Sequence, residues 1–241
     1  MAQIDVIIEY NDNGFLVWAD NYPGAFSRGA TRALAFHKLP AEVSAYAYWA
    51  TGKSIPALNR DAINVLHESR TCLAVEDADS DVLFPSERLP MSMAEYTQKK
   101  SLCLKSAHDF QLLFDSIPQK DRALLKSRKT FYGKIPQTAR EMVAHTNDTI
   151  AYYATSMGIP YENAASLVEN RKALFAAIEA QPDFLYPRVV EGDAHELWTL
   201  KKLLRRVLWH DRIHARALYR HAITFWQKER IENPYCFRIE K

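Results

Sequence analysis

Alternating apolar and polar positions mark the start of the chain and predict a β-hairpin. Apolar side chains recur at every second position or closer from Ile4 to Tyr10, and residues 15 to 19 form a second run of β-prone side chains. The Asn-Asp-Asn-Gly segment between them has the residue types of a tight turn. We therefore expect a hairpin over residues 3 to 20, with its pairing ended by Tyr22-Pro23-Gly24.

Helical spacing replaces this alternation between residues 30 and 49, a stretch rich in alanine and leucine. Pro40 lies inside it and lacks the N–H that a helix interior needs, so the pattern predicts either one kinked helix or two short ones. Residues 62 to 66 and 71 to 75 have the composition of strands, and residues 82 to 84 are a candidate for another. The first part is therefore predicted to be an α+β domain with a small antiparallel sheet and a helix.

A polar stretch without periodicity follows, bracketed by Pro85 and Pro90, and it predicts a linker with a domain boundary near Arg88. The expected domains are residues 1 to 88 and residues 89 to 241.

The second domain has helical periodicity throughout. A capping box at Ser92 to Glu95 opens its first helix, and Pro136 and Pro160 stand at first-turn positions of two others. Four amphipathic helices are expected, over residues 92–117, 136–157, 160–181 and about 193–227. Their number and length predict an all-α, up-and-down four-helix bundle.

Composition narrows the class of protein. With 241 residues and 48% hydrophobic side chains, the chain can bury one large core or two smaller ones. A net charge of +2 with 25% charged residues gives no global attraction to nucleic acid or anionic membranes. The three cysteines form no CxxC pair, which argues against a disulfide framework and favours a reducing cytoplasm. The sequence contains neither a signal-peptide pattern nor an apolar run of membrane-spanning length.

The candidate chemistry lies in the last helical segment. Steps of three and four residues define one largely apolar stripe, made of Leu200, Leu203, Val207, His210, His214, Ala217 and His221. Uncharged imidazoles on a core-facing stripe need partners for their ring nitrogens, and a divalent metal is a partner that His210 and His214 can share. Two protein ligands seldom suffice, so a third is expected elsewhere.

The third ligand is expected in the segment from 136 to 157. One helical face there carries Glu141, Met142, His145, Thr149 and Tyr152. If this face meets the histidine stripe, then His145, His210 and His214 form a three-histidine site. Such a site keeps open positions for water or substrate, as reactive metal sites do, whereas structural zinc is normally closed by a fourth protein ligand.

The first part of the sequence resembles a known fold. Gly14-Phe15-Leu16-Val17-Trp18-Ala19-Asp20, followed by Tyr22-Pro23-Gly24-Ala25-Phe26-Ser27-Arg28-Gly29-Ala30-Thr31 and a helix, is similar to the HicB-like antitoxin fold. Arg32-Ala33-Leu34 stands where that family commonly has acidic residues, and no DNA-binding segment follows. The resemblance therefore implies a scaffold or a partner-binding module, without antitoxin activity.

The second part resembles the DinB-like family of metal-binding four-helix bundles. Arg140-Glu141-Met142-Val143-Ala144-His145 is similar to that family's second helix. Trp198-Thr199-Leu200-Lys201-Lys202-Leu203-Leu204, followed by Trp209-His210-Asp211-Arg212-Ile213-His214-Ala215-Arg216, is similar to its last helix. The resemblance implies a divalent cation held by the three imidazoles, with zinc or nickel preferred and manganese or iron as alternatives. Ala215-Arg216 replaces the Arg-Gly that often follows the last ligand, which leaves the reaction open.

Several residues can be interpreted either as functional or as ordinary structural or solvent-exposed side chains. Glu141 either orients a ligand or is a solvated helix carboxylate, and with Tyr152 and Tyr153 it is a candidate for proton transfer. His221 lies roughly 10 Å beyond His214 by helical rise, so we interpret it as a pocket-lining or core histidine. His108 could point either way.

Two charged clusters are interpreted as solvated. The basic cluster at the start of the last helix is expected on its wet face: Lys201, Lys202, Arg205 and Arg206. The acidic cluster lacks the glycine and the closing glutamate of a calcium loop: Glu76, Asp77, Asp79 and Asp81. Asp211 does not supply the glutamate of an HExxH protease motif, so that mechanism is not expected.

Two functions are compatible with these features. The first is a metal-dependent enzyme of the thiol-dependent transferase or hydrolase type, acting on a small molecule that could be a low-molecular-weight thiol. The second is a non-catalytic stress-response or regulatory protein, in which the metal fixes the bundle and the HicB-like module recruits a partner. An exposed edge of the small sheet would suit a homodimer, whereas nucleic acid and membranes are not expected partners.

Overall fold

The chain divides into two compact units, of which the first ends at Phe84 and the second begins at Pro85. The computed structural model describes residues 3–130 and 133–239. The boundary expected near Arg88 coincides with the end of a short 3-10 helix, η3 (Pro85–Arg88), in the second unit. No helix within the described ranges combines the length and the apolar character that crossing a bilayer requires.

The first unit begins with the predicted hairpin. Strands β1 (Ile4–Asn11) and β2 (Gly14–Ala19) pair antiparallel, with Asn11 opposite Gly14 at the turn, so the hairpin is confirmed. The pairing does not end at Tyr22-Pro23-Gly24 as predicted, because β3 (Phe26–Gly29) pairs antiparallel with β2. The reason is local: Ala25 N donates to Tyr22 O and Ala19 N to Ala25 O, which turns the chain back onto β2.

A long helix then carries the chain from β3, at one edge of the sheet, to the opposite edge. Helix α1 (Arg32–Thr51) is one continuous helix that contains Pro40, and it precedes β4 (Ile63–Arg70). Strand β4 pairs parallel with β1, in the order β3-β2-β1-β4. The sheet is therefore mixed, and the predicted antiparallel sheet is corrected, because a helical crossover delivers the next strand in the parallel direction.

The other two predicted strands of this unit are absent from the described structure. Residues 71–74 and 82–84 are irregular, and a short 3-10 helix, η2 (Val75–Asp77), lies between them. Their apolar side chains cover the sheet instead: Val75 is buried, and the rings of Phe84 and Trp18 lie 6.2 Å apart. Composition alone does not distinguish apolar residues that are buried against a sheet from residues that pair as one of its strands.

Gly29 supports the close approach of β3 to α1 and gives a testable prediction. A Cβ there would lie 2.6 Å from the backbone nitrogen of Ala35, so Gly29→Ala should destabilise the protein by up to about 3 kcal/mol. Gly52→Ala is the matched control: its φ of 69° favours glycine, but nothing lies within 4 Å, and it should cost about 1 kcal/mol. Thermal unfolding of the two variants compares them, and equal losses would contradict the close approach.

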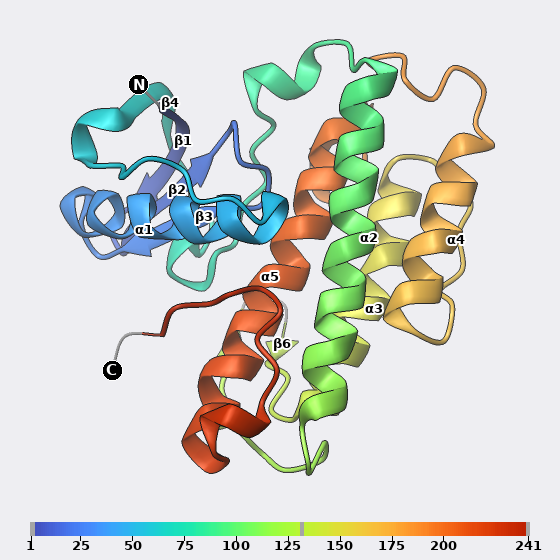
Figure 1. Cartoon of the computed structure of the whole chain (residues 1–241). Coiled ribbons are helices and arrows are strands. Elements are labelled where there is room, and N and C mark those ends of the chain that lie inside the picture. The colour runs from blue at the N-terminus through green and yellow to red at the C-terminus, as the bar shows by residue number, and fades with distance from the viewer. Residues whose placement is uncertain (1–2, 131–132, 240–241) are drawn as a thin grey trace. The chain divides into compact units, whose positions relative to one another are not determined.

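Within residues 85–130 and 133–239, the second unit contains four long helices (Figure 1). They are α2 (Met93–Ser116), α3 (Ala139–Ser156), α4 (Leu167–Glu179) and α5 (Leu200–Phe225). Each begins at a hydroxyl side chain that accepts a hydrogen bond from a backbone N–H of the first turn, and these caps are Ser92, Thr138, Ser166 and Thr199. The predicted four helices are thus confirmed in number and type.

The directions of these helices differ from the prediction. Helices α2 and α3 each pack against both α4 and α5. Glu95 and Lys201 form an ion pair 3.2 Å long, so α2 and α5 begin at the same end of the unit. Tyr96 donates to Glu179, which places the last turn of α4 at that end too. Because α2 and α5 run parallel while α4 runs the opposite way, the helices do not alternate as in an up-and-down bundle (Figure 1).

Three helix starts also lie later than predicted. Helix α3 begins at Ala139 rather than at Pro136, because Thr138 is its N-cap. Helix α4 begins at Leu167 rather than at Pro160, because the side chain of Asn170 accepts from Ala164 N and holds the preceding segment in an irregular conformation. Helix α5 begins at Leu200 rather than near residue 193, after a small hairpin of β7 (Val190–Glu191) and β8 (Leu197–Trp198). A second small hairpin precedes α3, formed by β5 (Lys129–Thr130) and β6 (Gly133–Lys134).

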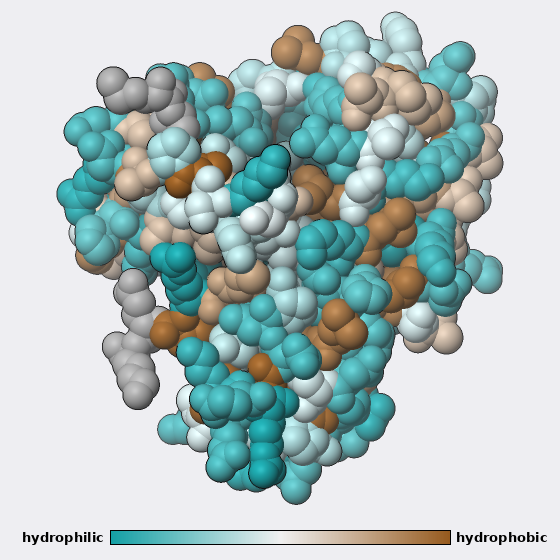
Figure 2. Space-filling view, in the orientation of Figure 1, coloured by the Kyte–Doolittle hydropathy of each residue, from teal (hydrophilic) through white to brown (hydrophobic). Residues whose placement is uncertain are grey.

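The basic side of α5 is largely buried, which corrects the predicted wet face. Lys202 is fully buried and lies 2.8 Å from a carboxylate oxygen of Glu196. Arg205 forms a buried bidentate pair with Glu87, with N–O distances of 2.6 and 3.1 Å. The charges are accommodated because residues outside the four long helices bring carboxylates to them. The face drawn in Figure 2 is mostly hydrophilic, with apolar residues scattered over it.

Candidate metal centre

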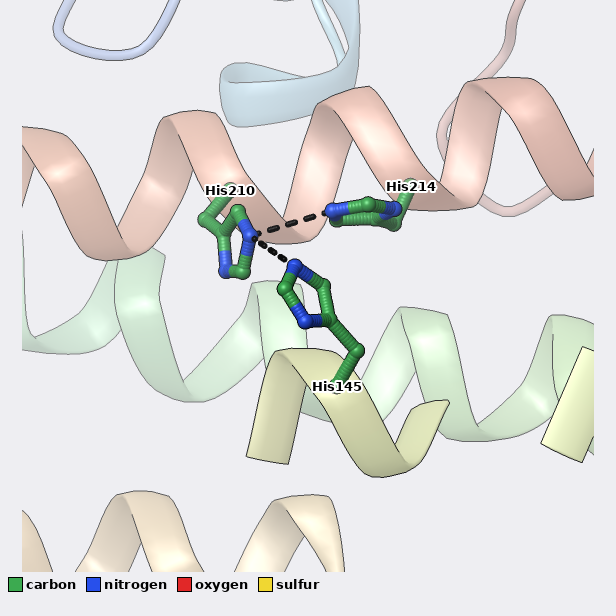
Figure 3. Close-up of side chains that lie close together, drawn as sticks. All are labelled: His145, His210 and His214. Carbon is green, nitrogen blue, oxygen red and sulfur yellow. Dashed lines mark hydrogen bonds between the residues drawn. The ribbon is translucent and has the colours of Figure 1, made fainter. Parts of the chain in front are cut away.

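The three histidines that the sequence pattern selected lie together between α3 and α5 (Figure 3). His210 and His214 lie on successive turns of α5, and His145 projects from α3 toward them. The Nε2 atom of His210 lies 3.2 Å from Nε2 of His145 and 3.0 Å from Nε2 of His214. The ring planes cross at 68°, 76° and 89°, so the rings meet through their nitrogen-bearing edges and do not stack.

These separations fit a shared divalent cation. Zinc binds imidazole nitrogen at about 2.0–2.1 Å, and tetrahedral geometry then puts two ligand nitrogens about 3.3 Å apart. The observed separations of 3.2 and 3.0 Å are close to that value, and one nitrogen of each ring lies within 4.8 Å of the others. Within residues 3–130 and 133–239, no cysteine, aspartate, glutamate or further histidine joins this group. The protein would therefore supply three ligands and leave the remaining positions to water or substrate.

The electrostatics of the site favour uncharged imidazoles. Burial lowers the pKa of His210 well below its ordinary value, and the neighbouring His214 and His145 lower it further. Burial also lowers the pKa of His214 to about 3 and lowers that of His145, which the Asp148 carboxylate partly opposes. Neutral rings offer lone pairs to a metal without first releasing a proton, so all three are prepared as ligands near neutral pH.

The three imidazoles differ in their exposure to solvent. His210 is 5% exposed, whereas His145 and His214 are half-buried. The ring of Trp209 lies 5.6 Å from that of His210, and the ring of Tyr153 lies 6.1 Å from it. Aromatic side chains thus cover His210, whereas the other two rings are partly exposed.

The three candidates for proton transfer have different positions. The carboxylate of Glu141 accepts from the backbone N–H groups of Gln137 and Thr138, so it completes the capping box of α3 and is engaged at the helix start. Burial and Glu196 raise the pKa of Tyr152 to about 12, and its hydroxyl donates to Glu196. Tyr153 is buried beside His210, and burial raises its pKa. Of the three, Tyr153 is the one in ring contact with the histidine cluster.

The remaining histidines singled out in the sequence lie outside the cluster. His221 contacts Arg220 through its Nε2, and burial lowers its pKa. His108 has a side chain that is 61% exposed and lies beside Asp109. Neither contributes a nitrogen to the group of three.

Two features near the site were missed by sequence reasoning. Thr149 contacts His210, and its place one turn after His145 on the same helical face was a usable signal. Arg171 of α4 and Asp211 of α5 form an ion pair 2.8 Å long, with side chains 1% and 0% exposed. No local pattern marks that pair, because its members are 40 residues apart.

Comparisons with protein-family models, with curated proteins and with solved structures found no match to this chain. The geometry of the histidine cluster is therefore the observation on which a functional assignment rests. The resemblances to HicB-like and DinB-like proteins stay predictions.

Proposed function

We propose that this chain is a divalent-metal-binding protein and that the cation serves a metal-dependent reaction on a small molecule. The convergence of three imidazole nitrogens from α3 and α5 supports the proposal. His145, His210 and His214 would hold the cation, with zinc or nickel preferred from the resemblance to DinB-like bundles. The absence of a fourth protein ligand among the described residues favours a reactive site over a structural one.

Such a cation supplies Lewis-acid chemistry, which polarises a substrate oxygen or stabilises a thiolate. The residues of this chain would then position the reactants. Trp209 and Tyr153 shield the buried His210 from solvent, and the partly exposed His145 and His214 would face the substrate. A transferase or hydrolase reaction fits this arrangement, and a low-molecular-weight thiol is the first co-substrate to test.

A second candidate is a non-catalytic binding protein, in which the metal stabilises the bundle and the first unit recruits a partner. It is favoured by the edge strand β4, where Val65 and Leu66 are 37% and 50% exposed. A second copy of the chain or another protein could add a strand there. A fully metallated sample that stays inactive with a panel of small thiols would favour this candidate over the enzyme.

The metal content of the protein tests the three-histidine metal site, on which both candidate functions depend. Protein purified without a histidine tag and incubated with zinc or nickel should bind about one cation per chain, measured by elemental analysis after desalting. His210→Ala should reduce this to near zero, because two ligands seldom hold a cation. His221→Ala, on the same helix but outside the cluster, should bind as the wild type does. Equal, near-zero binding by wild type and His210→Ala would refute the proposal.

A further inference from the structure

We infer that Thr149 is a positioning residue that fixes the ring proton of His210 on Nδ1 and so directs Nε2 toward the candidate cation. The inference rests on the proposed metal site and deepens it. Thr149 lies one turn after His145 in α3, and its Oγ1 is 2.6 Å from the His145 carbonyl oxygen. The same Oγ1 is 3.1 Å from Nδ1 of His210. One hydroxyl thus connects the backbone of one candidate ligand to the ring of another.

The short contact decides which way the proton points. Two acceptor oxygens 2.6 Å apart repel each other unless a proton lies between them, so the Thr149 hydroxyl donates to the His145 carbonyl. The alternative acceptor, the Thr146 carbonyl oxygen at 3.4 Å, lies on the same helix and requires the same direction. The oxygen of Thr149 can then offer His210 only a lone pair, and Nδ1 must be the donor.

The consequence falls on the other ring nitrogen. A neutral imidazole carries a single ring proton, so His210 with Nδ1–H has a bare lone pair on Nε2. That atom is the central one of the cluster, 3.2 Å from Nε2 of His145 and 3.0 Å from Nε2 of His214. Outer hydrogen bonds of this kind set the tautomer and orientation of metal-binding histidines, and their loss commonly weakens metal binding by about 10- to 100-fold.

Thr146, in the same helix as Thr149, provides a matched control. Thr146 is buried in the same helix, and its hydroxyl donates to the Met142 carbonyl at 2.9 Å. It therefore makes the same kind of backbone hydrogen bond as Thr149, and among the described residues it contacts no histidine ring. Thr149→Val and Thr146→Val remove the same group from the same helix, while Thr149→Ser restores the hydroxyl.

The test reads the tautomer directly in metal-free protein, by nitrogen NMR of the His210 ring near neutral pH. Wild type, Thr149→Ser and Thr146→Val should carry the proton on Nδ1, and Thr149→Val should populate the Nε2–H form. In zinc titrations against a competing chelator, Thr149→Val alone should raise the Kd by about 10- to 100-fold.

A wild-type His210 that carries its proton on Nε2 would overturn the inference, as would a Thr149→Val variant with unchanged tautomer. Equal weakening of zinc binding by Thr146→Val would show a general effect of helix packing and would also overturn it. Because the tautomer is read without metal, wild-type protein that fails to bind zinc refutes the proposed function and leaves the inference about Thr149 decided by the NMR result.

Discussion

Arg171→Met is expected to lower the free energy of unfolding by about 3–5 kcal/mol, because it leaves the buried carboxylate of Asp211 without its counter-ion. In the wild type, Nη2 of Arg171 lies 2.8 Å from Oδ1 of Asp211, and both side chains are at most 1% exposed. Methionine fills much of the space of arginine, so the loss reflects the charge more than a cavity. Urea unfolding at pH 7, followed by circular dichroism, measures it.

The loss should depend on pH in a defined direction. Burial raises the pKa of Asp211, and Arg171 opposes that rise. Without Arg171, the folded-state pKa of Asp211 should lie further above its unfolded value, so the folded variant takes up a proton that the unfolded chain releases. The deficit relative to wild type should therefore shrink as the pH falls from 7 toward 4.

Two further variants make this prediction specific. The double variant Arg171→Met with Asp211→Leu should recover most of the stability, since replacing both members of a buried pair by apolar groups is often neutral. Lys172→Met removes the adjacent ion pair on the same helix, in which Lys172 and Glu169 are 60% and 63% exposed, and it should cost less than about 1 kcal/mol. If Arg171→Met costs no more than Lys172→Met, the buried pair does not stabilise the bundle in the way described.

The features that the sequence predicted are those with local causes. The hairpin of β1 and β2 follows from turn residues next to alternating runs, and the four helices follow from periodicity and hydroxyl caps. The histidine site follows from two helical faces, since His210 and His214 are fixed by spacing on one helix. The approach of His145 to these two residues depends on how α3 packs against α5. It could be expected from the sequence because both histidine-bearing faces are core-facing.

The features that were missed have causes far apart in the sequence. The parallel pairing of β4 with β1 depends on where a crossover helix places the next strand. The late start of α4 depends on Asn170, whose amide also donates to Asn147 in α3, and first-turn chemistry at Pro160 gives no sign of this. Lys202 and Arg205 were expected in solvent because charge usually means exposure, and their carboxylate partners became apparent only in three dimensions. The pairing of Arg171 with Asp211 likewise became apparent only in the fold.

The metal-free protein is expected to lose stability steeply as the pH falls below about 6.5. Burial lowers the pKa of His214 from 6.5 to about 3 and lowers that of His210 well below 6.5, whereas both rings have ordinary values when unfolded. The unfolded chain therefore binds protons that the folded chain does not, and acid favours unfolding. Each ring that stays neutral in the folded protein lowers the free energy of unfolding by up to about 1.4 kcal/mol for every unit by which the pH falls. Urea unfolding at half-unit pH steps from 7.5 to 5, with a chelator present, measures the slope.

A histidine variant separates this effect from general acid sensitivity. His214→Gln removes one shifted group, so its stability should fall less steeply with acid than that of the wild type. Zinc at 100 times its Kd should add about 2.7 kcal/mol at pH 7.5. That gain should persist toward pH 5, because the folded rings stay neutral and keep their lone pairs for the cation. A wild-type slope equal to that of His214→Gln would mean that the rings are not held neutral. Zinc stabilisation that disappears between pH 6.5 and pH 5 would mean that the cation competes with protons for rings of ordinary pKa.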